Sequence, residues 1–117
     1  MNSYKELLVW QKSMALVTQI YPATASLPGN ELYGLISQIR RSAVSIPTNI
    51  AEGYGRHATQ DYIRFLKIAR GSLFELQTLL EISRNLSYID TECFQKLIGT
   101  DNEIERMLTA LIKKLQK

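Results

Sequence analysis

Few residues in this chain could carry catalytic chemistry. His57 is the only histidine and Cys93 the only cysteine among 117 residues, which excludes an internal disulfide and leaves any histidine-dependent triad to rest on His57 alone. His57 falls in a predicted loop, and a lone cysteine such as Cys93 is usually a small packing residue. The Gly53-x-Gly55 pair lacks the preceding strand that a dinucleotide-binding motif requires. We therefore expect a protein that is not an enzyme, with no cofactor and no metal.

Basic side chains concentrate in the middle of the sequence. The chain has 14 Lys and Arg against 11 Asp and Glu, a net charge of +3. Between residues 40 and 70, six bases and two acids give +4, which leaves −1 for the remainder. Such bases bind phosphates, and Tyr54 and Tyr62 nearby could add stacking on RNA bases. The candidate nucleic-acid-binding residues are Arg40, Arg41, Arg56, Arg64, Lys67 and Arg70.

A polar stripe forms a second candidate surface. At 100° per residue, a helix through this segment places seven polar residues on one face: Gln38, Arg41, Ser42, Ser45, Asn49, Glu52 and Arg56. Small hydroxyls and amides outnumber charges here, which favours a recognition or subunit-contact surface. The alternative is an ordinary solvated face, in which the Glu52–Arg56 pair contributes a few tenths of a kcal/mol. The sequence leaves both interpretations open.

The elements that position these residues are helices. Apolar residues recur at steps of three and four in four series, with Pro22 and residues 27–30 ending the first. Short connections make successive helices antiparallel neighbours. The sequence therefore predicts one all-α domain over residues 1–117, an antiparallel up-down-up-down four-helix bundle. The series are Leu7, Trp10, Met14, Val17, Tyr21; Ile36, Ile39, Ala43, Ile46, Ile50, Gly53; Tyr62, Leu66, Ala69, Leu73, Leu76, Leu80; and Leu97, Ile104, Leu108, Leu111, Leu115.

Pro47 lies inside the second predicted helix. Its missing N–H and its ring disturb the bond to the carbonyl of Ala43, so we expect a kink, with Ser42 or Ser45 satisfying that carbonyl. A new helix capped by Ser45 is the alternative. One kinked helix is favoured because the apolar series keeps its phase from Ala43 to Ile50.

The third predicted helix has more apolar residues than a four-helix bundle can cover. Five of them lie off its main stripe, and a helix that is apolar on several sides needs a further partner. We expect self-association through these residues: Ile63, Ile68, Phe74, Leu79 and Ile82. No apolar run approaches the 18 or so residues of a membrane span, and no signal peptide is recognisable. The expected location is the cytoplasm, away from any membrane.

Three sequence blocks resemble a known family. Residues 33–35 (YGL) and 38–53 (QIRRSAVSIPTNIAEG) resemble the signature of the 23S rRNA-intervening-sequence proteins, which are bacterial four-helix bundles. Residues 69–76 (ARGSLFEL) look like the family's second block and residues 9–11 (VWQ) like its N-terminal block. The signature residues of most interest are Gln38, Ser45, Pro47, Asn49, Glu52 and Gly53.

The resemblance implies a cytoplasmic, ring-shaped homopentamer without established enzymatic activity. Some relatives are encoded inside insertions in 23S rRNA genes. A related branch, the accessory variability proteins of diversity-generating retroelements, engages a reverse transcriptase and nucleic acid. We therefore expect a non-enzymatic oligomer that binds RNA or another nucleic acid. The alternative is a protein-interaction adaptor, such as an accessory subunit of a reverse transcriptase.

Overall fold

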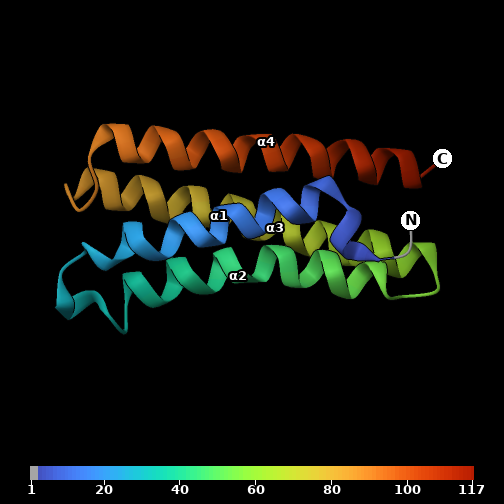
Figure 1. Cartoon of the computed structure of the whole chain (residues 1–117), viewed down its shortest axis with the longest axis horizontal. Coiled ribbons are helices and arrows are strands. Elements are labelled where there is room, and N and C mark those ends of the chain that lie inside the picture. Colours follow the sequence, from blue (N-terminus) through green and yellow to red (C-terminus); the bar gives the residue numbers. More distant parts are fainter. Residues whose placement is uncertain (1–2) are drawn as a thin grey trace.

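Four long helices make up nearly all of the chain (Figure 1). The structure is a computed structural model that describes residues 3–117. The helices are α1 (Leu8–Ala25), α2 (Leu35–Tyr54), α3 (Thr59–Asn85) and α4 (Thr91–Leu115), with short 3-10 helices η1 (Tyr4–Glu6) and η2 (Gly29–Glu31). The described part of the chain has no strand, so the predicted all-α four-helix fold is confirmed. No helix of this part is long and apolar enough to cross a membrane.

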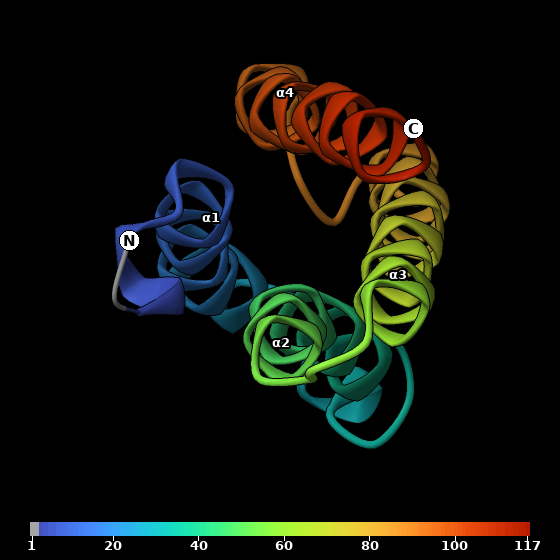
Figure 2. The same ribbon diagram turned by 90° about the vertical axis from the view of Figure 1, so that its right-hand side faces the viewer.

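Each helix packs against two others, and consecutive helices run in opposite directions along a molecule of 44 × 23 × 20 Å (Figure 1). The end-on view shows the order α1, α2, α3, α4, with α1 and α3 on opposite sides of α2 (Figure 2). Contact between α2 and α3 is the most extensive, and contact between α1 and α4 is the least. The α2–α3 connection and the end of α4 lie at the same end of the bundle (Figure 1).

The end of α1 differs from the prediction, whereas α4 begins at a regular cap. Asp90 caps α4, its carboxylate accepting the N–H of Cys93 at 2.7 Å. Helix α1 does not end at Pro22 but continues to Ala25. Pro22 lies on the exposed side of the last turn. The hydroxyl of Thr24 donates to the carbonyls of Ile20 and Tyr21 at 2.9 and 3.1 Å, which stabilises that turn.

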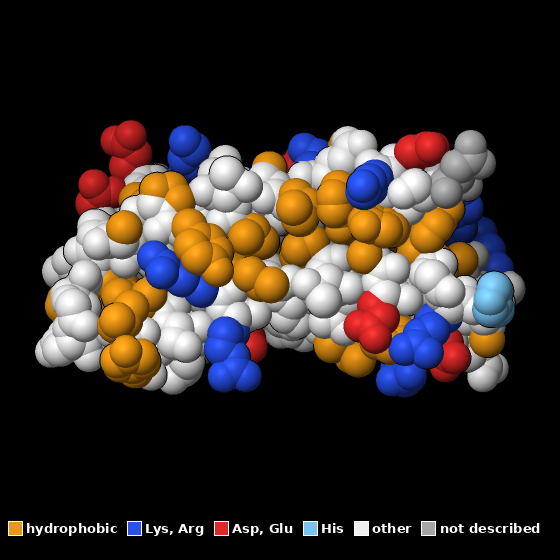
Figure 3. Space-filling model, turned by 60° about the horizontal axis from the view of Figure 1, so that its bottom comes forward, with side chains coloured by type: hydrophobic (Ala, Val, Ile, Leu, Met, Phe, Trp, Pro, Cys, Tyr) orange, Lys and Arg blue, Asp and Glu red, His pale blue; other side chains and the backbone are white. Residues whose placement is uncertain are grey.

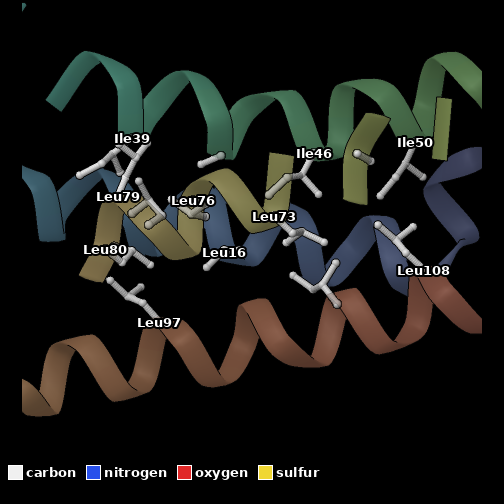
Figure 4. Packing of buried hydrophobic residues seen from close by; sticks show 14 of the residues in the cluster. Leu16, Ile39, Ile46, Ile50, Leu73, Leu76, Leu79, Leu80, Leu97 and Leu108 are labelled. Carbon is white, nitrogen blue, oxygen red and sulfur yellow. The ribbon is translucent and has the colours of Figure 1, made fainter. Parts of the chain in front are cut away.

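The core is formed by the apolar faces of the four helices (Figure 4). The predicted faces of α2 and α3 are correct, with Ile39, Ile46 and Leu73 fully buried. The predicted face of α1 is wrong, because its buried residues are Val9, Ser13, Leu16, Ile20 and Thr24. Ser13 can be buried because its hydroxyl donates to the carbonyl of Val9 at 2.7 Å.

Helix α2 is one uninterrupted helix through Pro47, as expected, and the proline side chain is buried. The hydroxyls expected to replace the lost hydrogen bond have other partners. Ser42 Oγ donates to the carbonyl of Ile39 at 3.0 Å, and Ser45 Oγ bonds to a hydroxyl of α3. The kink at Pro47 stays a prediction.

Candidate interaction surfaces

The inner half of the polar stripe of α2 lies against α3. Ser45 Oγ and Ser72 Oγ form a hydrogen bond of 2.8 Å between the two helices, and Asn49 Nδ2 donates to Ser45 Oγ at 2.9 Å. Ser42 is buried. These residues stabilise the packing of α2 on α3, a role that the sequence interpretation did not include. The outer half of the stripe is exposed: Gln38, Arg41, Glu52 and Arg56.

Gly53 lets α2 and α3 approach each other closely. A Cβ atom at this position would lie 2.7 Å from Phe65 Cβ and 3.1 Å from Tyr62 Cδ1. Both distances are shorter than an ordinary carbon–carbon contact of about 3.5–4.0 Å. The glycine of the AEG signature therefore has a packing role.

Arg40, one of the six predicted nucleic-acid-binding residues, joins α2 to the end of α1. Its Nε donates to Thr24 Oγ1 at 2.9 Å, and one Nη donates to the carbonyl of Tyr21 at 3.3 Å. The guanidinium carbon lies 4.6 Å from the centroid of the Tyr21 ring. These three contacts engage Arg40 within the bundle.

Three other predicted bases also have partners within the chain. Arg70 Nη1 donates to Thr109 Oγ1 of α4 at 3.4 Å. Arg56 and Arg64 both lie over the ring of Phe65, with guanidinium carbons 4.8 and 4.6 Å from its centroid. Each also forms a loose, exposed ion pair, Arg56 with Glu52 at 3.4 Å and Arg64 with Asp61 at 3.8 Å. Such pairs are worth little, so both guanidinium groups stay available to an anion.

The predicted bases do not form one surface. Arg41 and Lys67 are exposed and have no hydrogen bond or ion pair to any described residue. Arg41 and Arg56 are 15 residues apart, which separates them by about 22 Å along the axis of α2. On the face shown in Figure 3, Lys and Arg side chains lie in separate groups with uncharged and apolar side chains between them.

The predicted stacking tyrosines pack on each other. The rings of Tyr54 and Tyr62 lie edge to face, 6.1 Å apart at an angle of 89°. Burial, and secondarily Tyr54, raises the pKa of Tyr62 above its ordinary value. This edge-to-face pair stabilises the end of the bundle.

The predicted oligomer-contact residues of α3 divide into two groups. Ile68, Phe74 and Ile82 are 43%, 49% and 40% exposed. Ile63 is half-buried and packs against the core. Leu79 is 6% exposed and belongs to the core, so its assignment to a subunit contact is wrong. The buried face of α3 is wider than its main stripe because α2 covers one edge of it.

An uncovered surface rich in apolar side chains lies between α1 and α2, where the sequence did not predict one. A hollow of about 700 Å³ is lined by five apolar or aromatic side chains, among them Leu32, Tyr33 and Val44, and by six polar ones that include Arg40 and Arg41. Tyr33 is 94% exposed. A second hollow continues along the same two helices and shares Val44 and Thr48 with the first. Figure 3 shows the resulting band of apolar side chains. We call it the apolar groove; its main residues are Trp10, Met14, Val17, Tyr21, Leu32, Tyr33, Val44, Pro47 and Ala51.

Two sequence signals could have revealed this groove. Val44 does not belong to the apolar series of α2, and Leu32 and Tyr33 do not belong to any of the four series. These three apolar residues therefore had no predicted place in the core. Met14 and Tyr21 were assigned to the core because the phase of α1 was wrong, but they are 41% and 43% exposed. With the correct phase, they fall beside Val44 and extend the exposed apolar surface.

The buried carboxyl of Asp101 is the most perturbed titratable group. Its side chain is 0% exposed in α4 and accepts a hydrogen bond of 2.6 Å from Gln77 Nε2 of α3 on Oδ1. Oδ2 has no hydrogen-bond partner. Burial raises the pKa of Asp101 to about 7, against the opposing effect of the Gln77 bond, and the charge of Glu105 raises it further.

The remaining candidate for chemistry, Cys93, has a thiol of low reactivity. Burial, followed by the charge of Asp90, raises its pKa, whereas Lys96 lowers it. The raised pKa disfavours the nucleophilic thiolate. Across residues 3–117, no three His, Cys, Asp or Glu side chains are grouped closely enough to hold a metal ion.

Comparison with known proteins agrees with the signature blocks. The family model of the 23S rRNA-intervening sequence proteins matches residues 5–110. The chain belongs to this family. It is also similar to a protein of unknown function from the S23 ribosomal protein family of Bacteroides thetaiotaomicron, with 30% identity and a TM-score of 0.84 over 91% of this chain and 99% of that one. No curated protein sequence matches the chain.

Proposed function

We propose that this member of the 23S rRNA-intervening sequence family is a cytoplasmic, non-enzymatic module that assembles into a homo-oligomer, a pentameric ring, and binds nucleic acid on the basic surface of that ring. The observation that carries the proposal is the apolar groove. It leaves Tyr33 and Val44 uncovered in a monomer, and contiguous exposed apolar surface of this kind is typical of interaction sites.

A second copy of the chain is the proposed occupant of the groove. Three further apolar side chains, Ile68, Phe74 and Ile82, are exposed along α3. Helices α1 and α3 lie on opposite sides of α2, so the two surfaces face different directions (Figure 2). In a ring, each subunit offers one surface to the preceding copy and a different surface to the next. Two unlike apolar surfaces on one subunit meet that requirement.

Assembly would also concentrate positive charge. Each subunit brings the +4 of residues 40–70, so five copies gather about +20. Arg41 and Lys67 have no hydrogen bond or ion pair within residues 3–117, and the ion pairs of Arg56 and Arg64 are loose and exposed. A polyanion that touches several subunits would therefore be held by many modest contacts.

The self-assembly is tested by light scattering on three variants. We expect the wild type at a mass near five times 13.4 kDa. Val44→Glu in the groove and Phe74→Glu on α3 should each reduce the mass to that of a monomer while the helical circular dichroism persists. Ala110→Glu, an exposed position of α4, is the matched control and should leave the mass unchanged. A monomeric wild type would refute self-assembly.

Nucleic-acid binding is tested by filter binding of RNA and of DNA across a series of salt concentrations. Retention that weakens steeply with salt supports the proposal, because phosphate contacts release counterions. No retention at low salt, or retention indifferent to salt, would refute it.

A protein-interaction adaptor is the second candidate. It is favoured by the engagement of Arg40 and Arg70 within the bundle, which leaves fewer bases for a polyanion than the sequence indicates. The groove would then receive another protein, such as a reverse transcriptase. Co-purification from the native host distinguishes the two: nucleic acid supports the first function, and one stoichiometric protein supports the second.

A further inference from the structure

The bases that lie closest together in space are not those closest together in sequence. Helix α4 ends at the same end of the bundle where α3 begins (Figure 1). Thr59, Gln60 and Ile63 of α3 line one hollow together with Leu115 and Gln116 of α4. An adjoining hollow is lined by Gln60 and Ile63 together with Arg64 and Lys67. The last turn of α4, with its lysines, therefore borders the basic first turns of α3.

The hydrogen bonds between the two helices fix their register. Arg70 bonds to Thr109, and Gln77 bonds to Asn102. Because the helices run in opposite directions, a step back from Arg70 on α3 corresponds to a step forward from Thr109 on α4. Lys67, three residues before Arg70, is therefore level with Lys113, four residues after Thr109. Thr109 and Lys113 share one side of α4, so Lys113 lies on the side that borders α3.

Five bases gather at this end, which we call the basic end: Arg64, Lys67, Lys113, Lys114 and Lys117. All five are exposed. The four lysines have no hydrogen bond or ion pair to residues that the structure describes, whereas Arg64 has the 3.8 Å pair with Asp61 and lies over the ring of Phe65. Together with Asp61 these residues carry +4, more than the +3 of the whole chain.

We propose that the basic end, formed jointly by the start of α3 and the end of α4, is the site that binds the phosphate backbone of nucleic acid. This inference rests on the nucleic-acid binding proposed above and moves the site away from Arg40 and Arg41. The neighbouring Gln60 and Gln116 offer amide groups to phosphate or sugar oxygens. Tyr54 and Tyr62, the nearest aromatic pair, are packed on each other. Contacts to phosphates without base stacking make the binding independent of sequence.

The test compares two double variants that lose the same charge. Lys67→Gln/Lys113→Gln removes two facing lysines from the basic end. Arg41→Gln/Lys96→Gln removes two exposed bases from the other half of the bundle, and neither basic side chain forms a hydrogen bond or ion pair with a residue that the structure describes. All four substitutions are at exposed positions, so the fold should be unchanged, as circular dichroism checks. Because Arg41 lines the hollow beside Val44, light scattering checks the oligomeric mass, and the slopes are compared only for variants that keep the mass of the wild type. Binding of fluorescent oligo(U) RNA is then measured by anisotropy against salt concentration.

We expect the slope of log affinity against log salt to become shallower by about 1.4 for Lys67→Gln/Lys113→Gln, since each single-strand phosphate contact contributes about 0.7. The control should keep the slope of the wild type. Equal losses in both double variants, or a loss confined to the control, would overturn the basic end as the site while leaving nucleic-acid binding intact. A wild type that binds no RNA would overturn both proposals, and so would binding to phosphatidylserine vesicles without binding to RNA.

Discussion

Replacing Asp101 with asparagine should stabilise the protein increasingly as the pH rises. In the folded chain the pKa of Asp101 is about 7, whereas the ordinary value that applies to the unfolded chain is 3.8. The folded state therefore holds the proton more tightly, and ionisation penalises folding. The penalty is absent below pH 4, grows as the pH rises from 4 to 7 and is complete above 7. Its full size is about 4 kcal/mol, from about 1.4 kcal/mol per pKa unit.

Asparagine keeps the oxygen that accepts the 2.6 Å bond from Gln77 and carries no charge at any pH. The difference in unfolding free energy between Asp101→Asn and the wild type should therefore grow by about 2.5 kcal/mol between pH 5 and pH 8. Urea unfolding, followed by helical circular dichroism at one protein concentration, measures this difference. A difference for Asp101→Asn that stays constant with pH would refute the reasoning.

Three further substitutions test the packing described above. Gly53→Ala should lower the unfolding free energy by about 1–3 kcal/mol in thermal melts, because its Cβ would overlap Phe65. Gly71→Ala is the control and should raise the unfolding free energy by about 0.5–1 kcal/mol, because a Cβ there meets nothing within 4 Å. The opposite order would contradict the close approach of α2 and α3 at Gly53. Arg40→Gln should lower the unfolding free energy by about 1–2 kcal/mol in urea unfolding, because it loses the contacts with Thr24 and Tyr21. Arg41→Gln should lower it by less than about 0.5 kcal/mol. Equal effects of the two substitutions would argue against a structural role for Arg40. Ser45→Ala and Ser72→Ala should each lower the unfolding free energy by about 0.5–1.5 kcal/mol. The double variant should lose less than the sum of the two single effects, because both substitutions remove the same hydrogen bond. Full additivity in the same assay would show that this bond contributes nothing.

The sequence predicts the faces of α2 and α3 well because their core positions hold Ile and Leu at regular helical spacing. The face of α1 could not be predicted in the same way. Ser13 and Thr24 occupy its core positions, and only their hydrogen bonds to the carbonyls of their own helix make burial tolerable. Polar residues at core positions shift the apparent apolar series, which moved Met14 and Tyr21 into the expected core. The apolar groove was missed as a direct consequence of this shift.

The candidate site depends on contacts between residues far apart in the sequence. Lys113 and Lys67 are separated by 45 intervening residues, and only the register of α4 on α3 brings them level. The charge count along the sequence therefore emphasised residues 40–70 and left out the end of α4. The spacing of residues along the sequence also could not show that Arg40 contacts Tyr21 and Thr24, because these contacts depend on where α1 ends.

The close approach of α2 and α3 at Gly53 has a consequence for the order of folding. The two helices are adjacent in sequence and share the most extensive contact, so their association closes only a short loop. We expect this hairpin to form early and its amides to exchange hydrogen most slowly. Helices α1 and α4, whose mutual contact is the least extensive, would join it later. The apolar groove exists only once α1 has docked on α2, so a partner could occupy it only after that step of folding.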